Sequence, residues 1–475
     1  MECKLDPEFE KEIREIYYFI TRYGIEKVDH VNLGNKQSQE KIIKECHKGY
    51  GIAQERILKN LLKLERVLRD KNHQLKRSRR NRDSKESHKL AIEISSIDFR
   101  ISVFHKLADA IAWILMGGEK YIARRFYLGK PCVRLLDSNI ESVRKESDEL
   151  NKNGLRFALI SDLTSVIQIG DLCVIDFSED KVKIELIEVK EGKMNEICLN
   201  FIDSLVHTKC PRSMYYFHQQ YGEKSREQVL RILKQREKGM RAIEILKEGK
   251  GEDYQTGRKI KIPDKPLKLE FYDDFLLKGI SRAKEKGWYY GTFDGCIWIG
   301  VYLPSVFPDP SIVFRLACLA DISHIKEIPI EKISEKEDMI LPYPVVDIRQ
   351  GFYTPLAIPL FLRNIPPEYI LDIIMGRIQI LLYFDFDIWF KMAENIGIGG
   401  KWSTRKQASK QKRIIKDIFC VKNRIPMLEV NGREMYAGDG ILVRVLFDGI
   451  TPKSALSFFR NKEEDGNVQE NDSGK

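Results

Sequence analysis

The segment that most constrains the fold is Ile169-Gly-Asp-Leu-Cys-Val-Ile-Asp-Phe177, followed by Ser178-Glu-Asp-Lys181 and then by Val182-Lys-Ile-Glu-Leu-Ile-Glu-Val-Lys190. The first and third runs are rich in β-branched and apolar residues, and the second is a polar break of four residues. This pattern predicts a β-hairpin. The fold and the function predicted for the chain both depend on this hairpin.

The register of this hairpin decides which polar side chains meet. If Phe177 pairs with Val182 across the polar break, the antiparallel ladder places Asp171 directly opposite Glu188. Because strand side chains alternate between faces, Lys190 projects on the same side as Glu188. The sequence therefore predicts two carboxylates and one ammonium on a single patch, which is a candidate metal site.

The apolar side chains of both strands indicate a buried sheet. They would line both faces, with Leu172, Val174, Ile187 and Val189 on one face and Cys173, Ile175, Ile184 and Leu186 on the other. Strands that are apolar on both faces are central and buried. Carboxylates there are costly without a metal or a partner. The alternative is that Glu and Lys simply alternate on an ordinary exposed strand.

Gly170-Asp171 followed by Glu188-Val189-Lys190 resembles the PD-(D/E)XK nuclease superfamily over roughly residues 90–245, with a glycine where the family name has a proline. The resemblance implies an α/β fold with a mixed sheet flanked by helices. It implies that Asp171, Glu188 and the backbone carbonyl of Val189 bind Mg²⁺ or Mn²⁺, and that Lys190 orients or deprotonates the attacking water. Hard divalent cations prefer such oxygen ligands.

The resemblance also implies a further acid from the helix that precedes the sheet. In the helix expected over residues 89–116, Asp98, Ser102, His105 and Asp109 form one polar stripe. Asp109 has apolar neighbours and is the best candidate for a third catalytic carboxylate. A solvated helix face is the alternative, and His105 fits a packing or hydrogen-bonding role.

Several residues are candidates for contacts with nucleic acid. In the helix expected over 225–247, one face carries three polar side chains, and surface decoration is the alternative there. Two basic segments, residues 76–82 and 401–416, could bind a phosphate backbone, and solvated loops or a partner-docking surface are the alternatives. In the second segment Trp402 could stack on a base. The candidate residues are Lys193, Gln228, Arg231, Gln235, Arg77, Arg79, Arg80, Arg405 and Lys406.

The chain has 475 residues, a length that favours two or three domains. We expect a helical region over 1–88 with a basic hairpin tip, a nuclease-like domain over 89–248, a linker over 249–267, a C-terminal α/β domain of unknown fold over 268–460 and a disordered acidic tail over 461–475. In the C-terminal domain, Asp294-Gly295 predicts a type I′ turn. A helix is expected to open at Pro366 and to run through Ile378 and Leu381.

Composition points to a polyanionic partner in the cytoplasm. The formal net charge is +10, which favours nucleic acid, most plausibly DNA. The nine cysteines form no C-x-x-C pair, the N-terminus lacks the apolar core of a signal peptide, and charges interrupt every long apolar run. We therefore expect reduced thiols and no membrane partner, while protein partners or a homo-oligomer stay open.

Together these observations favour a metal-dependent nuclease that hydrolyses phosphodiester bonds of DNA. The resemblance implies a regulated effector in prokaryotic defence, restriction or repair. The competing hypothesis is a non-catalytic scaffold subunit that binds nucleic acid or a protein partner.

Overall fold

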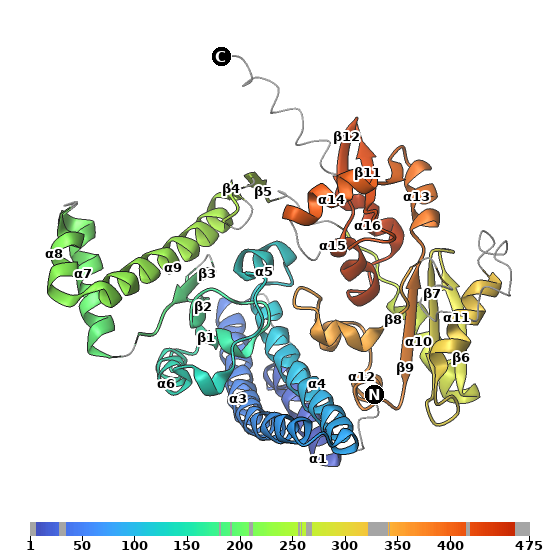
Figure 1. Cartoon of the computed structure of the whole chain (residues 1–475), viewed down its shortest axis with the longest axis horizontal. Coiled ribbons are helices and arrows are strands. Elements are labelled where there is room, and N and C mark those ends of the chain that lie inside the picture. Colours follow the sequence, from blue (N-terminus) through green and yellow to red (C-terminus); the bar gives the residue numbers. More distant parts are fainter. Residues whose placement is uncertain are drawn as a thin grey trace. The chain divides into compact units, whose positions relative to one another are not determined.

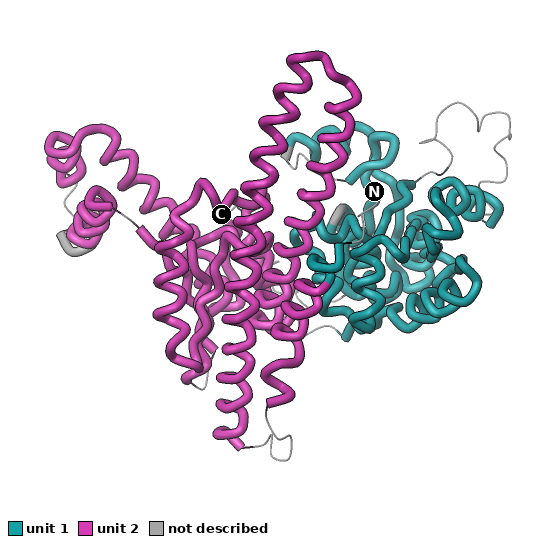
Figure 2. Tube along the Cα trace, turned by 90° about the horizontal axis from the view of Figure 1, so that it is seen from below, with its two compact units in different colours: residues 1–10, 265–475 teal, residues 11–264 magenta. Residues whose placement is uncertain are grey.

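The fold is described from a computed structural model that covers residues 6–27, 35–179, 182–190, 192–208, 212–254, 257, 259–262, 268–321, 341, 343–414 and 419–460. The chain forms two compact units (Figures 1 and 2). One comprises residues 11–264, and the other comprises residues 1–10 with 265–475. The helical region and the nuclease-like segment, expected as separate domains, thus lie within one compact unit.

Helices dominate the unit of residues 11–264. Its elements are α1 (Pro7–Thr21, which begins in the other unit), α2 (Tyr23–Glu26), α3 (Lys36–Arg80), α4 (Ser84–Leu115), α5 (Lys120–Phe126), η2 (Leu135–Asp137), α6 (Ile140–Leu150), β1 (Arg156–Ile160), η3 (Ser161–Leu163), β2 (Leu172–Asp176), β3 (Lys183–Ile187), α7 (Lys193–Thr208), α8 (Ser213–Tyr221), α9 (Glu223–Glu248), β4 (Lys250–Glu252) and β5 (Lys259–Lys261).

Helices α3 and α4 form the expected antiparallel hairpin (Figure 1). The side chain of Asn35 caps α3 by accepting from the N–H of Gln37, and the side chain of Asp83 caps α4 by accepting from the N–H of Glu86. A connection of three residues joins the helices, and Arg82 in it has a positive φ of 55°. The basic cluster at the tip therefore belongs largely to the last turn of α3 and not to a loop.

The predicted hairpin forms, with the predicted register. Strands β1, β2 and β3 make a three-stranded sheet in that order, and Leu172 pairs with Ile187 and Val174 with Glu185. The expectation of a mixed sheet is wrong for the described strands, because every pair is antiparallel. Strand β2 is buried, whereas β3 lies at the edge with partly exposed side chains. Burial of both strands on both faces is thus confirmed only for β2.

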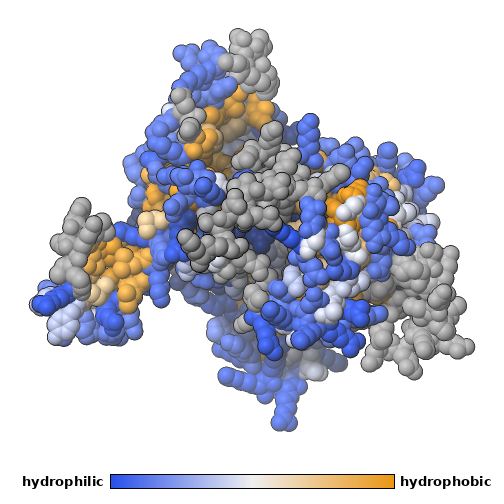
Figure 3. All heavy atoms as spheres, turned by 90° about the horizontal axis from the view of Figure 1, so that it is seen from above, coloured by the Kyte–Doolittle hydropathy of each residue, from blue (hydrophilic) through white to orange (hydrophobic). Residues whose placement is uncertain are grey.

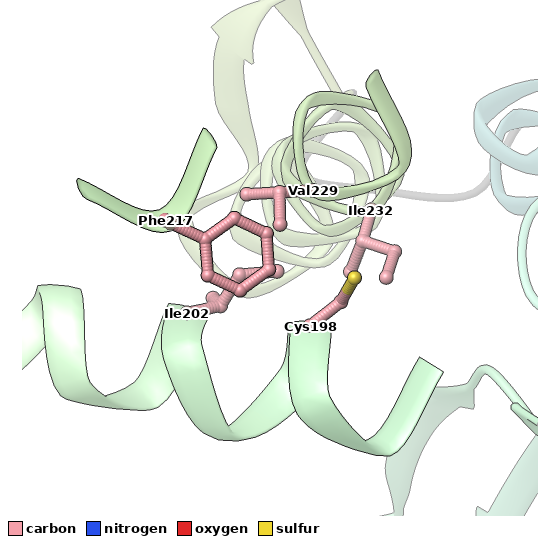
Figure 4. Packing of buried hydrophobic residues seen from close by; sticks show 5 residues of the cluster. All are labelled: Cys198, Ile202, Phe217, Val229 and Ile232. Carbon is pink, nitrogen blue, oxygen red and sulfur yellow. The ribbon is translucent and has the colours of Figure 1, made fainter. Parts of the chain in front are cut away.

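A small apolar core holds the long helix α9 in place. Figure 4 shows side chains from α7, α8 and α9 pointing toward one another. The ring of Phe217 stacks on that of Phe201, with 4.1 Å between ring centroids. The buried members of the core are Cys198, Ile202, Phe217, Val229 and Ile232. This packing fixes the position of α9, which faces β3.

The second unit carries two antiparallel sheets, in the orders β6-β7-β9-β8 and β10-β11-β12. Its elements are α10 (Asp273–Lys286), β6 (Trp288–Phe293), β7 (Ile297–Tyr302), α11 (Pro310–Asp321), β8 (Val346–Asp347), η7 (Ile348–Tyr353), η8 (Leu360–Leu362), α12 (Pro367–Ile374), β9 (Gln379–Phe384), α13 (Phe386–Glu394), β10 (Gly399–Trp402), α14 (Arg405–Ile414), β11 (Pro426–Val430), β12 (Arg433–Tyr436), α15 (Asp439–Leu442), the π-helical turn η9 (Val443–Phe447) and α16 (Pro452–Arg460).

The structure tests three local predictions in the C-terminal half. Asp294 and Gly295 both have positive φ, as a type I′ turn requires, between β6 and β7. Helix α12 opens at the expected prolines but ends at Ile374, because Gly376 adopts a φ of 72°. The expected linker over 249–267 contains the short hairpin of β4 and β5. The tail over 461–475 lies outside the described residues.

Hydrophilic side chains cover most of the face in Figure 3, where apolar side chains gather in separate patches. Among the described residues, no single helix is both long and apolar enough to cross a membrane. Only α4 and α5 reach that composition together, with a bend of 120° between them, and the second half of α4 is buried core.

Candidate active site

Asp171 lies directly before β2, and backbone hydrogen bonds to Ile187 in β3 and to Ser161 directly after β1 fix its backbone. Its N–H donates to the carbonyl of Ile187 at 2.8 Å, and its carbonyl accepts from the N–H of Ser161 at 2.9 Å. Its carboxylate Oδ2 accepts from the N–H of Val189 at 2.6 Å. The side chain is therefore held against the end of β3, next to Glu188.

Gly170 occupies a backbone position that a proline could not adopt. Its φ is 78°, in the left-handed region that glycine adopts without strain. Proline is locked near −65° and could not make this turn into β2. The glycine at this position therefore has a backbone cause.

The carboxyl of Asp171 is electrostatically unusual. Burial and then the charge of Glu188 raise its pKa, the Val189 N–H and Lys190 oppose the shift, and the resulting pKa is about 6. Between its unfolded pKa near 4 and this value, the folded protein binds a proton that the unfolded chain releases. The free energy of unfolding therefore falls as the pH rises through this window. A bound cation would offset the unfavourable burial of the ionised Asp171 carboxylate.

Asp162 is the site residue that the sequence patterns did not single out. It lies in η3, directly after Ser161, whose backbone pairs with Asp171. Burial raises its pKa first, and the charges of Glu188 and Glu65 add to the rise. A third carboxyl thus stands near Glu188. The signal that could have found it is an acid two residues after the end of the buried strand β1, which precedes β2 in the chain.

Lys190 is placed as the sequence predicts, beside Glu188. Its Nζ donates to Oε2 of Glu188 at 2.8 Å and to Oε1 of Gln235 at 3.2 Å. Only 10% of the Lys190 side chain is exposed. An ammonium has three N–H donors, so these two bonds leave one donor for a water or a phosphate oxygen.

Of the other predicted phosphate contacts of this region, Gln235 alone bonds Lys190, from α9, among the described residues. Gln228 on the same helix instead donates to Asn195 at 2.6 Å. Arg231 and Lys193 are exposed. One of the three residues expected on that helix face therefore belongs to the site.

Asp109 is buried in a separate cluster. Its carboxylate accepts from the N–H of Ser165 at 2.7 Å and from the hydroxyl of Ser165 at 2.6 Å, and it pairs with Nζ of Lys106 at 3.0 Å. His105 bonds the carbonyl of Leu163 at 2.8 Å, which agrees with its expected hydrogen-bonding role. These bonds anchor the loop between η3 and β2 and give Asp109 a positioning role, and its expected catalytic role stays a prediction.

A groove of about 890 Å³ opens beside these groups, between β3 and α9. Glu188, Lys190 and Gln235 line it together with apolar side chains of both elements. Gly239 is buried on α9, where an added Cβ would lie 3.7 Å from the side chain of Leu186. The groove gives a substrate direct access to Lys190 and Glu188.

The remaining basic candidates lie in two places. Arg77, Arg79 and Arg80 are exposed in the last turn of α3. Arg405 and Lys406 are exposed in the first turn of α14, in the other unit. The indole of Trp402 is not placed for stacking on a base. It stacks on Tyr343 with 5.7 Å between centroids and donates to Asp387 at 3.0 Å.

The donor set fits a hard divalent cation that keeps several waters. Among the described side chains, no three His, Cys, Asp or Glu residues are gathered tightly enough to enclose a metal ion. Mg²⁺ needs no such cage, because it binds through one or two carboxylates plus water and substrate phosphate. Asp171 and Glu188 could supply these carboxylates. The carbonyl of Val189 already accepts from Asn139 at 3.0 Å and keeps a second lone pair.

Comparisons with models of known protein families, with curated proteins and with solved structures give no match to this chain.

Proposed function

We propose that this protein is a divalent-metal-dependent nuclease of the PD-(D/E)XK type that hydrolyses phosphodiester bonds of DNA. The observation that supports it most is the half-buried carboxyl of Asp171, whose pKa burial and Glu188 raise to about 6. A carboxyl whose pKa is raised by burial and by a neighbouring carboxylate, close to a largely buried lysine, is typical of catalytic sites. A purely structural hairpin has no need for this arrangement.

Each residue has a role in this proposal. Asp171 and Glu188 would hold Mg²⁺ or Mn²⁺, with Asp162 as a further oxygen donor nearby. A bound divalent ion neutralises the charge that builds on the phosphate during hydrolysis. Lys190, oriented by Glu188 and Gln235, would donate its remaining N–H to the attacking water or to a phosphate oxygen.

The decisive assay is cleavage of plasmid DNA by the full-length protein with Mg²⁺, with Mn²⁺ and with a chelator. We expect cleavage with either metal, none with the chelator, and a loss of at least about 10³-fold in Asp171→Ala, because such a variant lacks a ligand of the ion. Asp176→Ala is the matched control, since Asp176 lies at the other end of β2 and pairs with Arg156.

Wild-type protein that leaves DNA intact under every metal condition, and that binds no divalent ion, would contradict the proposal. That outcome together with unchanged DNA affinity in Asp171→Ala would favour the non-catalytic scaffold instead.

A further inference from the structure

A stretch of basic side chains on α3 lies outside the candidate active site. Between Arg66 and Arg82 the sequence has eight Lys or Arg residues and a single acid, Asp70. Five members of this stretch follow one another at spacings of three or four residues, which places them on one face of a helix. They are Arg66, Arg69, His73, Lys76 and Arg80, and all are exposed. We call them the α3 basic face.

A pocket of about 230 Å³ lies against the middle of this face. Arg69, His73 and Lys76 line it from α3, and Arg134 lines it from the segment before η2. No described residue forms an ion pair with Arg69 or Lys76. Within the described part of the chain, the ion-pair contact of Arg134 is a long one of 3.6 Å with the partly exposed Asp98. The pocket therefore gathers positive charge that the protein itself leaves largely uncompensated.

Two acids also line this pocket. Glu65 is buried, and its carboxylate accepts from the N–H groups of Leu135 and Leu136 at 3.2 and 3.1 Å, so it builds the pocket wall. Asp137 is the other acid. Against them stand Arg69, Lys76 and Arg134, so the charge balance of the pocket favours an anion.

Helix stabilisation accounts for only part of the basic face. Arginines in the last turn of a helix interact favourably with its dipole, which explains Arg77, Arg79 and Arg80. That effect fades beyond the terminal turn, and Arg66 and Arg69 lie three to four turns before the end of α3. These more distant arginines need another explanation.

The geometry of the face fits the backbone of a duplex. From Arg66 to Arg80 a straight helix rises about 21 Å, with a cation on nearly every turn, and a nucleic-acid duplex presents phosphates at similar intervals. Single-strand binding generally adds aromatic stacking platforms, and the α3 basic face has no Phe, Tyr or Trp. Helix α3 also contacts η3, the turn that contains Asp162, so the basic face belongs to a helix that borders the candidate active site.

We infer that the α3 basic face, with Arg134, is a phosphate-binding surface that holds the backbone of double-stranded nucleic acid beside the candidate active site. The inference deepens the proposed nuclease function and rests on it for the identity of the ligand. It assigns binding to residues that take no part in the hydrolysis itself.

The test is binding of a fluorescently labelled DNA duplex to the full-length protein in a chelator, so that cleavage cannot occur. Arg69→Gln/Lys76→Gln is expected to weaken binding about tenfold and to lower the slope of log affinity against log salt by about 2, because two phosphate contacts are lost. Lys145→Gln/Lys152→Gln removes two exposed lysines elsewhere in the same unit and is expected to change neither quantity. Arg69→Lys/Lys76→Arg keeps both charges and is expected to restore binding.

Three outcomes would overturn the inference. One is an unchanged affinity and salt slope in Arg69→Gln/Lys76→Gln, and another is an equal loss in the control pair. The third is stronger binding to single strands or to phosphatidylserine vesicles than to the duplex. The failure of the nuclease proposal is separable, because a protein that binds the duplex through Arg69 and Lys76 but never cleaves it would refute the catalytic role alone.

Discussion

Lys190→Ala is expected to slow metal-dependent DNA cleavage by about 10²–10³-fold, the usual loss when one donor to the transition state is removed. Divalent-metal affinity should stay the same or rise, because a cation bonded to Glu188 at 2.8 Å competes with a metal for that carboxylate. The two effects are measured by single-turnover cleavage at saturating metal and by a metal titration of the same variant.

A loss of cleavage without a loss of metal affinity distinguishes a catalytic defect from misfolding. A variant that simply misfolded would lose metal binding together with cleavage. Lys183→Ala is the matched control, since Lys183 is the first residue of β3, the strand that leads to Lys190, and its exposed side chain pairs only with Glu179 among the described residues. Full cleavage by Lys190→Ala, or an equal loss in Lys183→Ala, would refute the assigned role.

Asp109→Ala is expected to destabilise the unit of residues 11–264 by about 3–5 kcal/mol, the range for breaking a buried ion pair. The side chains of Asp109 and Lys106 are almost fully buried, so the variant leaves an ammonium without its carboxylate and Ser165 without its acceptor. Guanidinium unfolding followed by circular dichroism measures the loss, and hydrogen exchange locates it in α4 and in the loop before β2.

The control for this prediction lies on the same helix. Asp98→Ala removes an exposed carboxylate that contacts Arg134 at 3.6 Å, and surface pairs of this kind contribute at most about 1 kcal/mol. Because the positioning role of Asp109 depends on its bonds to Ser165, Asp109→Asn should retain metal binding. A stable Asp109→Ala protein that has lost metal binding would instead make Asp109 a ligand.

The hairpin was predictable because its information is local. Two apolar strands and a break of fixed length leave one antiparallel register that pairs Leu172 with Ile187, and alternation then fixes the face of each side chain. The edge position of β3 was not predictable in the same way. It depends on which other strands join the sheet, although the charges of Lys183 and Glu185 are consistent with an exposed strand.

The surroundings of Asp109 and Asp162 could not be predicted, because they depend on contacts between distant segments. Apolar neighbours correctly indicated that Asp109 is buried, but they do not show that Ser165 and Lys106 occupy its oxygens. Asp162 gains its place through the pairing of β1 with β2. The hydrophobic periodicity of one segment does not predict which other strand it pairs with.

A short apolar run caused the wrong prediction of where α12 ends. The residues from Ile370 to Phe384 are apolar enough for either a helix or a strand, and periodicity alone does not separate the two. The left-handed glycine at position 376 ends α12, and Ile380 and Leu381 then pair within β9. A glycine in the middle of an apolar run was the available signal.

The central claim is that Asp171 and Glu188 hold a divalent cation, and titration of Mn²⁺ into the full-length protein by calorimetry tests it most directly. Because the pKa of Asp171 is raised to about 6, its carboxylate is ionised above that pH and protonated below it. Metal affinity should therefore fall as the pH is lowered through 6. Asp171→Asn keeps an acceptor for the Val189 N–H and is the variant to compare.

The account predicts that the wild type binds Mn²⁺ well above pH 6, that its affinity falls about tenfold per pH unit below that value, and that Asp171→Asn loses this binding. An affinity equal in the wild type and in Asp171→Asn, or a wild type that binds no divalent ion at any pH, would contradict it.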